Sequence, residues 1–402
     1  MKEKIEKKRI LFLTPRLPYP IIGGDKLKAY YMIKHLSTKH EVTLVSFYQG
    51  DQTKCDEYTN VIKQLGVNVF VIPLNPIKAG ITVLPRLLRP IPLEVLYYTQ
   101  KDYRKIVEDL LNTKKFDLVF SFFMRTAEYV KDRTDIKKIL MCEDCRTLYQ
   151  KRSSENSSNL IQKIVRVWDY HKLKKYEPNI VNFFDVVTLV TNEDINSMKQ
   201  QNPSPSYKLL TNGVDINKFV FDNTKHLDNT ILFAGKLDVW ANELMINSII
   251  DDILPIIKKE IPSIKLLIVG ANPSKKIQLL AKTNKYIELV ANVPDMLPYL
   301  HKANLFLHPH YGGSGIQNKL LEAMAAGCPV VTTQTGNQGI DAINNKEVLI
   351  GKTNEELAAC AIKILKSKEF ANTLAVNARF LMEKTHSWEI IFSQLNNIVD
   401  NV

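Results

Sequence analysis

Residues 308–340, HPHYGGSGIQNKLLEAMAAGCPVVTTQTGNQGI, decide the fold predicted for this chain. Glycines at 312, 313 and 315 form a loop after an apolar strand and let the backbone approach a ligand closely. A helix is predicted from Ile316 to Ala326, with Gly327 as its C-cap. Another strand starts after Pro329. The order strand, loop, helix, strand is typical of a parallel α/β sheet.

Two charged residues in this stretch face the same way. Lys319 and Glu322 are three residues apart, so they share one face of the first turns of the predicted helix. The free N–H groups and the positive dipole end of that helix form a site for anions. A cation for phosphate and a carboxylate for sugar hydroxyls, one turn apart, suit a sugar nucleotide.

Strand and helix signals alternate along the whole chain, which indicates two open α/β domains with mostly parallel sheets. One long helix is predicted at Glu243–Ile257. The main predicted strands are Arg9–Thr14, Glu41–Phe47, Asn68–Pro73, Phe116–Phe122, Lys138–Cys142, Phe184–Val190, Lys208–Leu210, Thr230–Ala234, Lys265–Val269, Ile287–Leu289, Leu305–His308 and Val330–Thr333. Such sheets bind ligands at the carboxyl ends of their strands, so we expect the ligand in a cleft between the domains.

The turn-rich segment Asn212-Gly213-Val214-Asp215 is the best domain boundary. It separates an N-terminal Rossmann-like domain, residues 1–212, from a second Rossmann-like domain, residues 213–385. The segment 386–402 is predicted to be an amphipathic helix that packs back on the first domain.

The composition is that of an ordinary soluble protein: 45% of the 402 residues are apolar and 24% are charged. No run approaches the roughly 18 apolar residues that span a bilayer, and Ile10–Leu13 is too short for a signal-peptide core. We therefore expect a cytoplasmic protein with reduced thiols. Cys142 and Cys145 form a lone C-x-x-C pair without further ligands, so neither a metal site nor a redox site is expected.

The positive charge is concentrated in the first half of the chain. Residues 1–212 carry 35 Lys+Arg and 23 Asp+Glu, whereas residues 213–402 carry 19 of each. This excess either keeps the surface soluble or faces an anionic partner, such as a phosphorylated acceptor or an acidic membrane surface. No motif supports binding of nucleic acid.

Two segments of this basic half combine apolar and basic residues. Leu84–Tyr98 mixes aliphatic residues, aromatic residues and arginines, and its three prolines forbid a continuous helix. It is either a surface for an acceptor or a membrane, or a loop that packs on the core. Leu160–Tyr176 is a basic amphipathic helix that either touches anionic headgroups or packs on the sheet.

Two further glycine loops follow predicted strands. Gly23 and Gly24 stand between the first strand and a helix, without the G-x-G-x-x-G spacing of a dinucleotide fingerprint. Gly235 and Lys236 end a later strand, without the Walker A pattern. Each loop is either an ordinary turn or a place where the chain meets a phosphate.

These motifs together resemble the family-4 retaining glycosyltransferases of GT-B fold, most of all the sugar transferases of bacterial exopolysaccharide and PEP-CTERM gene clusters. The resemblance covers roughly residues 8–350 and the helix around Trp388. Its most specific block is GIQNK-x-x-EAMA-x-G-x-PVV, and the other segments are RILFLTPRLPYPIIGGDKLKAY, LTNGVDINKF, ILFAGKLDVWAN, KLLIVGANPS and VPDMLPYLHKANLFLHP.

The resemblance implies the roles of most site residues. Lys236 and Lys319 would neutralise the donor diphosphate, and Glu322 would bind the ribose hydroxyls. The amides of Gly315, Ile316 and Gln317 would cap the diphosphate, with Gly23 and Gly24 nearby in the first domain. The family has a pair of Glu residues separated by seven positions, but Ser314 stands at the first of them here. The contact to the transferred sugar is therefore unassigned.

The predicted reaction is transfer of a sugar from a nucleoside-diphosphate donor to a glycan or lipid-linked acceptor, with retention, in surface polysaccharide synthesis. No Asp-x-Asp motif is present to hold a metal, and no cofactor is expected beyond the donor. Glu143 or Asp144 could take the acceptor proton, unless they are surface or capping acids. His308 and His310 are candidate sugar or nucleotide contacts.

Other readings stay open. The chain could be an epimerase or a phosphorylase of the same fold, or a non-catalytic subunit, for which Ser314 is the motivating feature. A basic nucleic-acid or membrane adaptor is a further alternative. The expected location is the cytoplasm, either free or peripheral at the inner face of the membrane.

Overall fold

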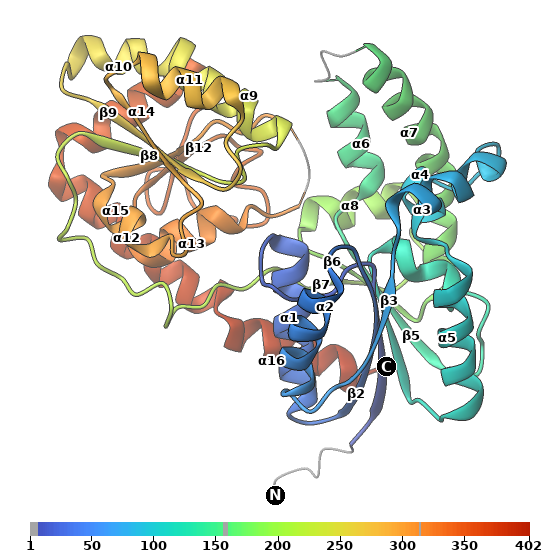
Figure 1. Ribbon diagram of the computed structural model, residues 1–402. Coiled ribbons are helices and arrows are strands. Elements are labelled where there is room, and N and C mark those ends of the chain that lie inside the picture. Colours follow the sequence, from blue (N-terminus) through green and yellow to red (C-terminus); the bar gives the residue numbers. More distant parts are fainter. Residues whose placement is uncertain (1–6, 156–159, 313–314) are drawn as a thin grey trace, which may run out of the picture. The chain divides into compact units, whose positions relative to one another are not determined.

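The computed structural model describes residues 7–155, 160–312 and 315–402 (Figure 1). Its contacts divide the chain into two compact units. The first unit holds the chain up to Leu210, Gly315 and the segment from Phe392 onward. The second unit holds the chain from Thr211 to Ile391, apart from the loop that ends at Gly315.

The first unit is built on a sheet of seven strands in the order β3-β2-β1-β4-β5-β6-β7, and every pair of neighbours is parallel. Its central strands are apolar on both faces, which is typical of a parallel sheet covered by helices. The strands are β1 (Arg9–Thr14), β2 (Glu41–Tyr48), β3 (Asn68–Pro73), β4 (Leu118–Phe122), β5 (Lys137–Glu143), β6 (Val186–Leu189) and β7 (Tyr207–Leu209).

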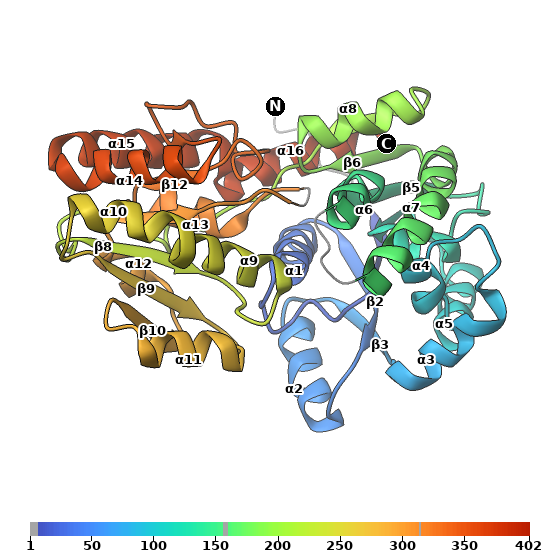
Figure 2. The ribbon, with the colours of Figure 1, turned by 90° about the horizontal axis from the view of Figure 1, so that it is seen from above.

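Helices cover this sheet on both faces (Figures 1 and 2). Buried side chains such as Leu11, Val45 and Leu140 form the core between the sheet and the helices. The α-helices are α1 (Gly24–Ser37), α2 (Gln52–Lys63), α3 (Pro76–Val83), α4 (Leu93–Tyr98), α5 (Lys101–Thr113), α6 (Arg146–Glu155), α7 (Leu160–Ile180) and α8 (Asn192–Gln201), and the short 3₁₀ turns are η1 (Leu84–Arg86), η2 (Met124–Tyr129) and η3 (Val181–Phe183).

The second unit has a six-stranded parallel sheet in the order β10-β9-β8-β11-β12-β13. Its strands are β8 (Thr230–Ala234), β9 (Lys265–Gly270), β10 (Ile287–Ala291), β11 (Leu305–His308), β12 (Val330–Thr332) and β13 (Leu349–Ile350). Its helices are α9 (Trp240–Ser248), α10 (Leu254–Glu260), α11 (Lys275–Thr283), α12 (Leu297–Lys302), α13 (Asn318–Ala326), α14 (Asn354–Lys366), α15 (Lys368–Leu381) and the start of α16 (Trp388–Asp400).

The predicted class of fold is confirmed, because both units are Rossmann-like with parallel sheets. The predicted helix at Glu243–Ile257 is confirmed as a continuous helical stretch, but it is not α-helical throughout. A π-helical turn, Ile249–Ile253, separates α9 from α10. Pro255, near the start of α10, has no N–H and its ring clashes with the carbonyl four residues earlier, so an unbroken α-helix is disfavoured there.

The junction motif and the C-terminal helix meet in the second unit. A Cβ atom on Gly213 would lie 2.6 Å from the ring of Trp388, so only glycine fits against this indole. The N–H of Val214 donates to the carbonyl of His386 at 2.7 Å. Within the first unit, Phe392 of the same helix stacks on His35 with 4.2 Å between ring centroids.

No helix in the described part of the chain is long and apolar enough to cross a membrane.

Candidate functional site

The sequence-predicted residues of the second unit gather where β8 and β11 end and α13 begins. Helix α13 starts at Asn318, two residues later than predicted, because Gly315 has a positive φ of 72° and Gln317 is extended. The amides of Gly315 and Ile316 therefore precede the helix, and Gln317 is its N-cap residue. Gly327 ends the helix in the left-handed conformation, as predicted.

Lys319 lies in the first turn of α13 and points its ammonium group at the end of β8. Its Nζ donates to Oδ1 of Asn242 at 2.9 Å and lies 5.5 Å from the centre of the Phe233 ring. A Cβ atom on Gly235 would be 3.1 Å from this Nζ, so glycine at the strand end leaves the space that the ammonium group uses. Burial lowers the pKa of Lys319 to about 8, although the charge of Glu322 opposes the shift.

Glu322 follows one turn later and is only partly exposed to solvent. Burial raises its pKa to about 7, and the nearby charges of Lys218 and Lys319 oppose that shift. Its carboxylate has no hydrogen bond or ion pair within the described part of the chain, unlike most buried carboxylates. It is therefore free to accept hydrogen bonds from a ligand.

His308 ends β11 near Lys319 and is fully buried. Its Nδ1 lies 3.4 Å from Oγ1 of Thr332, and its ring stacks on His310 with 5.2 Å between centroids. The Nε2 atom has no partner among the residues that the structure describes. Burial, together with Lys319 and His310, lowers the pKa of His308 well below its usual value, so the ring is neutral.

Lys236 is placed differently from Lys319. Its side chain is exposed and its Nζ lies 3.7 Å from Oδ2 of Asp238. Its backbone is tied to the site, because Nδ2 of Asn242 donates to the Lys236 carbonyl at 2.8 Å. Asn242 thus holds the glycine loop with one end of its amide and Lys319 with the other.

The junction motif contacts the start of α13. Nδ2 of Asn212 donates to Oδ1 of Asn318 at 2.7 Å, at the first residue of the helix. This contact positions the start of the helix.

In the first unit, Gly23 has a positive φ of 97° and is the N-cap of α1, and Gly24 is the first residue of that helix. One turn later Lys28 is fully buried. Its Nζ lies 2.9 Å from Oε1 of Glu143 and donates to the carbonyl of Leu210 at 2.6 Å. The alternative that Glu143 is a surface or capping acid was wrong, because the side chain is an internal partner of Lys28.

Asp144 follows Glu143 at the carboxyl end of β5 and is partly buried. Its Oδ2 accepts a hydrogen bond from Nη1 of Arg146 at 3.3 Å, and Arg146 also binds Glu94 at 2.9 Å. The candidate residues therefore belong to two units. Gly23, Gly24 and Asp144 lie in the first unit, and Lys236, His308, Lys319 and Glu322 lie in the second. Ser314 lies outside the described residues.

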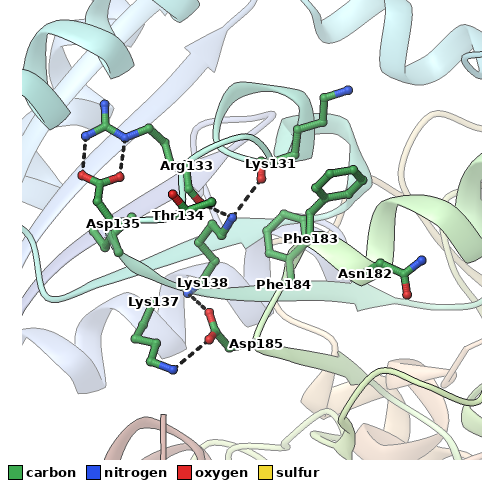
Figure 3. A pocket seen from close by; sticks show the side chains of 11 residues that line it. Lys131, Arg133, Thr134, Asp135, Lys137, Lys138, Asn182, Phe183, Phe184 and Asp185 are labelled. Atoms are coloured by element: carbon green, nitrogen blue, oxygen red, sulfur yellow. Dashed lines mark hydrogen bonds and ion pairs between the residues drawn. The ribbon is translucent and has the colours of Figure 1, made fainter.

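A pocket of about 490 Å³ in the first unit lies at the opposite edge of the sheet, where β5 and β6 begin (Figure 3). Its basic side chains already have partners: Arg133 is paired with Asp135 at 2.7 Å and Lys137 with Asp185 at 2.9 Å. Lys138 donates to the carbonyl of Lys131 at 2.9 Å. These cations are already paired with other residues that line the pocket. Ligands of parallel sheets bind at the other edge, where the strands end.

Within the described ranges, no group of three or more His, Cys, Asp and Glu residues is arranged to hold a metal ion. All five cysteines are free thiols, and Cys142 and Cys145 are buried. Burial raises the pKa of both of these thiols, which makes them poor nucleophiles.

Sequence reasoning missed two residues. Asn242 lies in the quoted motif ILFAGKLDVWAN, but nothing in the pattern shows that its amide reaches a residue 77 positions away. Lys28 looks like a surface lysine of an amphipathic helix, and its burial follows only from the packing of α1 on the sheet.

Residues 228–367 match the family model described as "Glycosyl transferases group 1". A Klebsiella pneumoniae protein described as an uncharacterized 44.6 kDa protein in cps region is 23% identical over 398 residues, covering 96% of this chain and 98% of that protein. The phosphatidyl-myo-inositol mannosyltransferase of Mycobacterium tuberculosis is 25% identical over 211 residues, covering 48% of this chain and 53% of that protein.

Solved structures with the same fold are more distant in sequence. Anabaena Alr3699/HepE, in complex with UDP and glucose, has a TM-score of 0.69 at 15% identity, covering 98% of this chain and 100% of that chain. Sucrose-phosphate synthase from Thermosynechococcus elongatus has a TM-score of 0.72 at 16% identity, covering 98% and 99%. The match to the glycosyl transferases group 1 model thus falls within the second unit, and the chain as a whole has the two-unit fold of GT-B type seen in these structures.

Proposed function

We propose that this protein transfers a sugar, with retention of the anomeric configuration, from a nucleoside-diphosphate donor to a glycan or lipid-linked acceptor in the synthesis of a surface polysaccharide. The observation that carries the proposal is the Lys319–Glu322 pair. An ammonium group and an unpartnered carboxylate stand one turn apart at the start of α13, beside the strand ends of a group 1 glycosyltransferase domain.

The chemistry follows from charge. Bond cleavage at the anomeric carbon leaves negative charge on the departing diphosphate. Lys319, held by Asn242, and the N-terminus of α13 stabilise that charge, and Lys236 can swing in from solvent. The carboxylate of Glu322 accepts hydrogen bonds from the ribose hydroxyls. We propose that no metal ion and no cofactor besides the donor takes part.

The biological setting is also a proposal. The Klebsiella relative, described as lying in a cps region, supports a role in surface polysaccharide synthesis. The mannosyltransferase relative, named for phosphatidyl-myo-inositol, supports a lipid acceptor. We propose that the protein works as a peripheral protein at the inner face of the membrane.

Product analysis tests the proposal. The full chain is incubated with UDP-, GDP-, ADP- and dTDP-sugars and short lipid-linked acceptors, and the anomeric configuration of the product is read by NMR. A product with the configuration of the donor supports it. Conversion of the donor without an acceptor would instead identify an epimerase, and binding without any turnover a non-catalytic subunit.

A further inference from the structure

One surface of the first unit combines exposed apolar side chains with unpaired basic ones. Figure 1 shows α6 and α7 projecting as a helical pair from this unit, and Figure 2 shows α4 beside α7. The segment from α3 to η1 continues the same region. We name the exposed apolar residues of α3, η1, the following loop and the first half of α7 the apolar surface; they are Ile77, Ile81, Leu84, Leu88, Leu160, Ile164, Val165, Val167 and Trp168.

The apolar residues form stripes. Ile77, Ile81, Leu84 and Leu88 are spaced by four, three and four residues, so the helical ones share a face, and Leu88 is 97% exposed. In α7, none of residues 163–168, all of which the structure describes, is buried. A helix that packed only on its own sheet would bury one apolar face here.

The two stripes belong to one surface because α7 contacts the loop after η1. Nζ of Lys172 bonds the carbonyl of Leu87, lies 3.4 Å from the carbonyl of Ile91, and sits 4.0 Å from the centre of the Trp168 ring. The N–H of Leu93 donates to Oδ1 of Asp169 at 2.8 Å. These contacts fix the loop that carries Leu88 against the middle of α7, next to the exposed Trp168.

The two segments that carry this surface are predominantly basic. Residues 76–91 contain Lys78, Arg86 and Arg89 and no acid, and residues 160–175 contain five basic residues and one acid, the buried Asp169. Lys78, Arg89 and Lys163 have no acidic partner in the described part of the chain. A second copy of this chain would bring like charges together, which is unfavourable.

We infer that the apolar surface is the membrane-docking site of this protein, inserting Leu88 and its neighbours into the interface of an anionic bilayer while the basic residues meet the headgroups. Apolar contact combined with basic charge is how interfacial helices bind anionic lipids. This inference deepens the proposed function, on whose membrane location it rests, by naming the surface. The inference assigns the membrane contact to α3, η1 and α7, and not to the positive charge of residues 1–212 as a whole.

Sedimentation with vesicles tests the inference on the full chain. We expect binding to phosphatidylcholine vesicles that contain phosphatidylglycerol, and little binding to phosphatidylcholine alone. The pair Ile81→Ser and Leu88→Ser should weaken binding at least tenfold. The matched control is Val376→Ser with Phe380→Ser, which changes two exposed apolar residues of α15 in the second unit.

Charge is tested in the same assay. Lys78→Gln, Arg89→Gln and Lys163→Gln together should weaken binding roughly 100-fold. Lys259→Gln, Lys275→Gln and Lys276→Gln remove the same charge from the second unit and should have much less effect.

Three results would overturn the inference: no vesicle binding by the wild type, equal losses in surface and control variants, or burial of this surface in a stable complex with another protein. Thermal stabilisation by nucleoside diphosphates, measured on the same samples, separates the two proposals. Nucleotide binding without vesicle binding would remove the docking surface and leave the donor site standing.

Discussion

Each unit contains a lysine and a glutamate at the carboxyl end of its sheet, but the two pairs differ in their contacts. In the first unit, Lys28 and Glu143 touch at 2.9 Å, and Lys28 also bonds the Leu210 carbonyl. In the second unit, Lys319 bonds Asn242 and Glu322 bonds nothing in the described part of the chain. The first pair uses its charges internally, so it is structural, whereas the second leaves a charge open to a ligand.

The largest effect is expected for the substitution Lys28→Met. It leaves the buried Glu143 without its partner and should lower the free energy of unfolding by about 3–5 kcal/mol. Urea denaturation measures the change. Adding Glu143→Gln should recover much of the loss, because the variant then buries no unpaired charge; a single variant as stable as the wild type would contradict a structural role.

The second prediction is that Lys319→Ala reduces the rate of sugar transfer roughly 100-fold, because the variant lacks a cation that stabilises the leaving diphosphate. The variant should still fold, because the Lys319 side chain is not part of the hydrophobic core. Initial rates of nucleoside diphosphate release measure the effect. Lys352→Ala, an exposed lysine of the same unit, is the control; equal rates in both variants would refute the site.

More of the fold than of the candidate site could be predicted from the sequence. The strands of both units were predictable because apolar runs of parallel strands end at proline, glycine or polar residues, as β1 does at Thr14 before Pro15. Lys319 and Glu322 were found because a helix brings residues three apart together. Asn242 and Lys28 were missed because their contacts depend on packing between distant segments, which no local pattern encodes.

The third prediction concerns pH. Glu322 gains its charge as the pH rises through its pKa of about 7, and Lys319 loses its charge above its pKa of about 8. Nucleotide affinity of the wild type should therefore peak between about pH 7 and 8 and fall roughly tenfold by pH 6. Titration calorimetry across this range tests it; in Glu322→Gln the acid limb should vanish, and its persistence would show that another group titrates.

The fourth prediction concerns the effect of the Glu322 carboxylate on the stability of the ligand-free protein. The pKa of Glu322 is raised from 4.5 to about 7, so folding favours its protonated form. Any stability from this group is present below pH 4.5 and is lost as the pH rises through 7. At pH 8, Glu322→Gln should stabilise the ligand-free protein by about 1 kcal/mol, after allowing for solvent screening. A large loss of stability would mean that Glu322 is structural, like Glu143.

The smallest expected effect is that of a chelator. The charge on the leaving diphosphate is assigned to lysines and a helix N-terminus, so excess EDTA should leave the transfer rate unchanged. Complete loss of activity, restored by Mg²⁺ or Mn²⁺, would contradict a metal-independent reaction.

The central claim is that the open Lys319–Glu322 pair binds a nucleoside diphosphate. The most direct test is thermal stabilisation of the wild type and of Glu322→Gln by UDP, GDP, ADP and dTDP in parallel, because a ligand of the native state raises the unfolding midpoint. The account predicts that one nucleotide raises the midpoint of the wild type and that the shift is largely lost in the variant. No shift with any nucleotide, or an equal shift in both proteins, would contradict it.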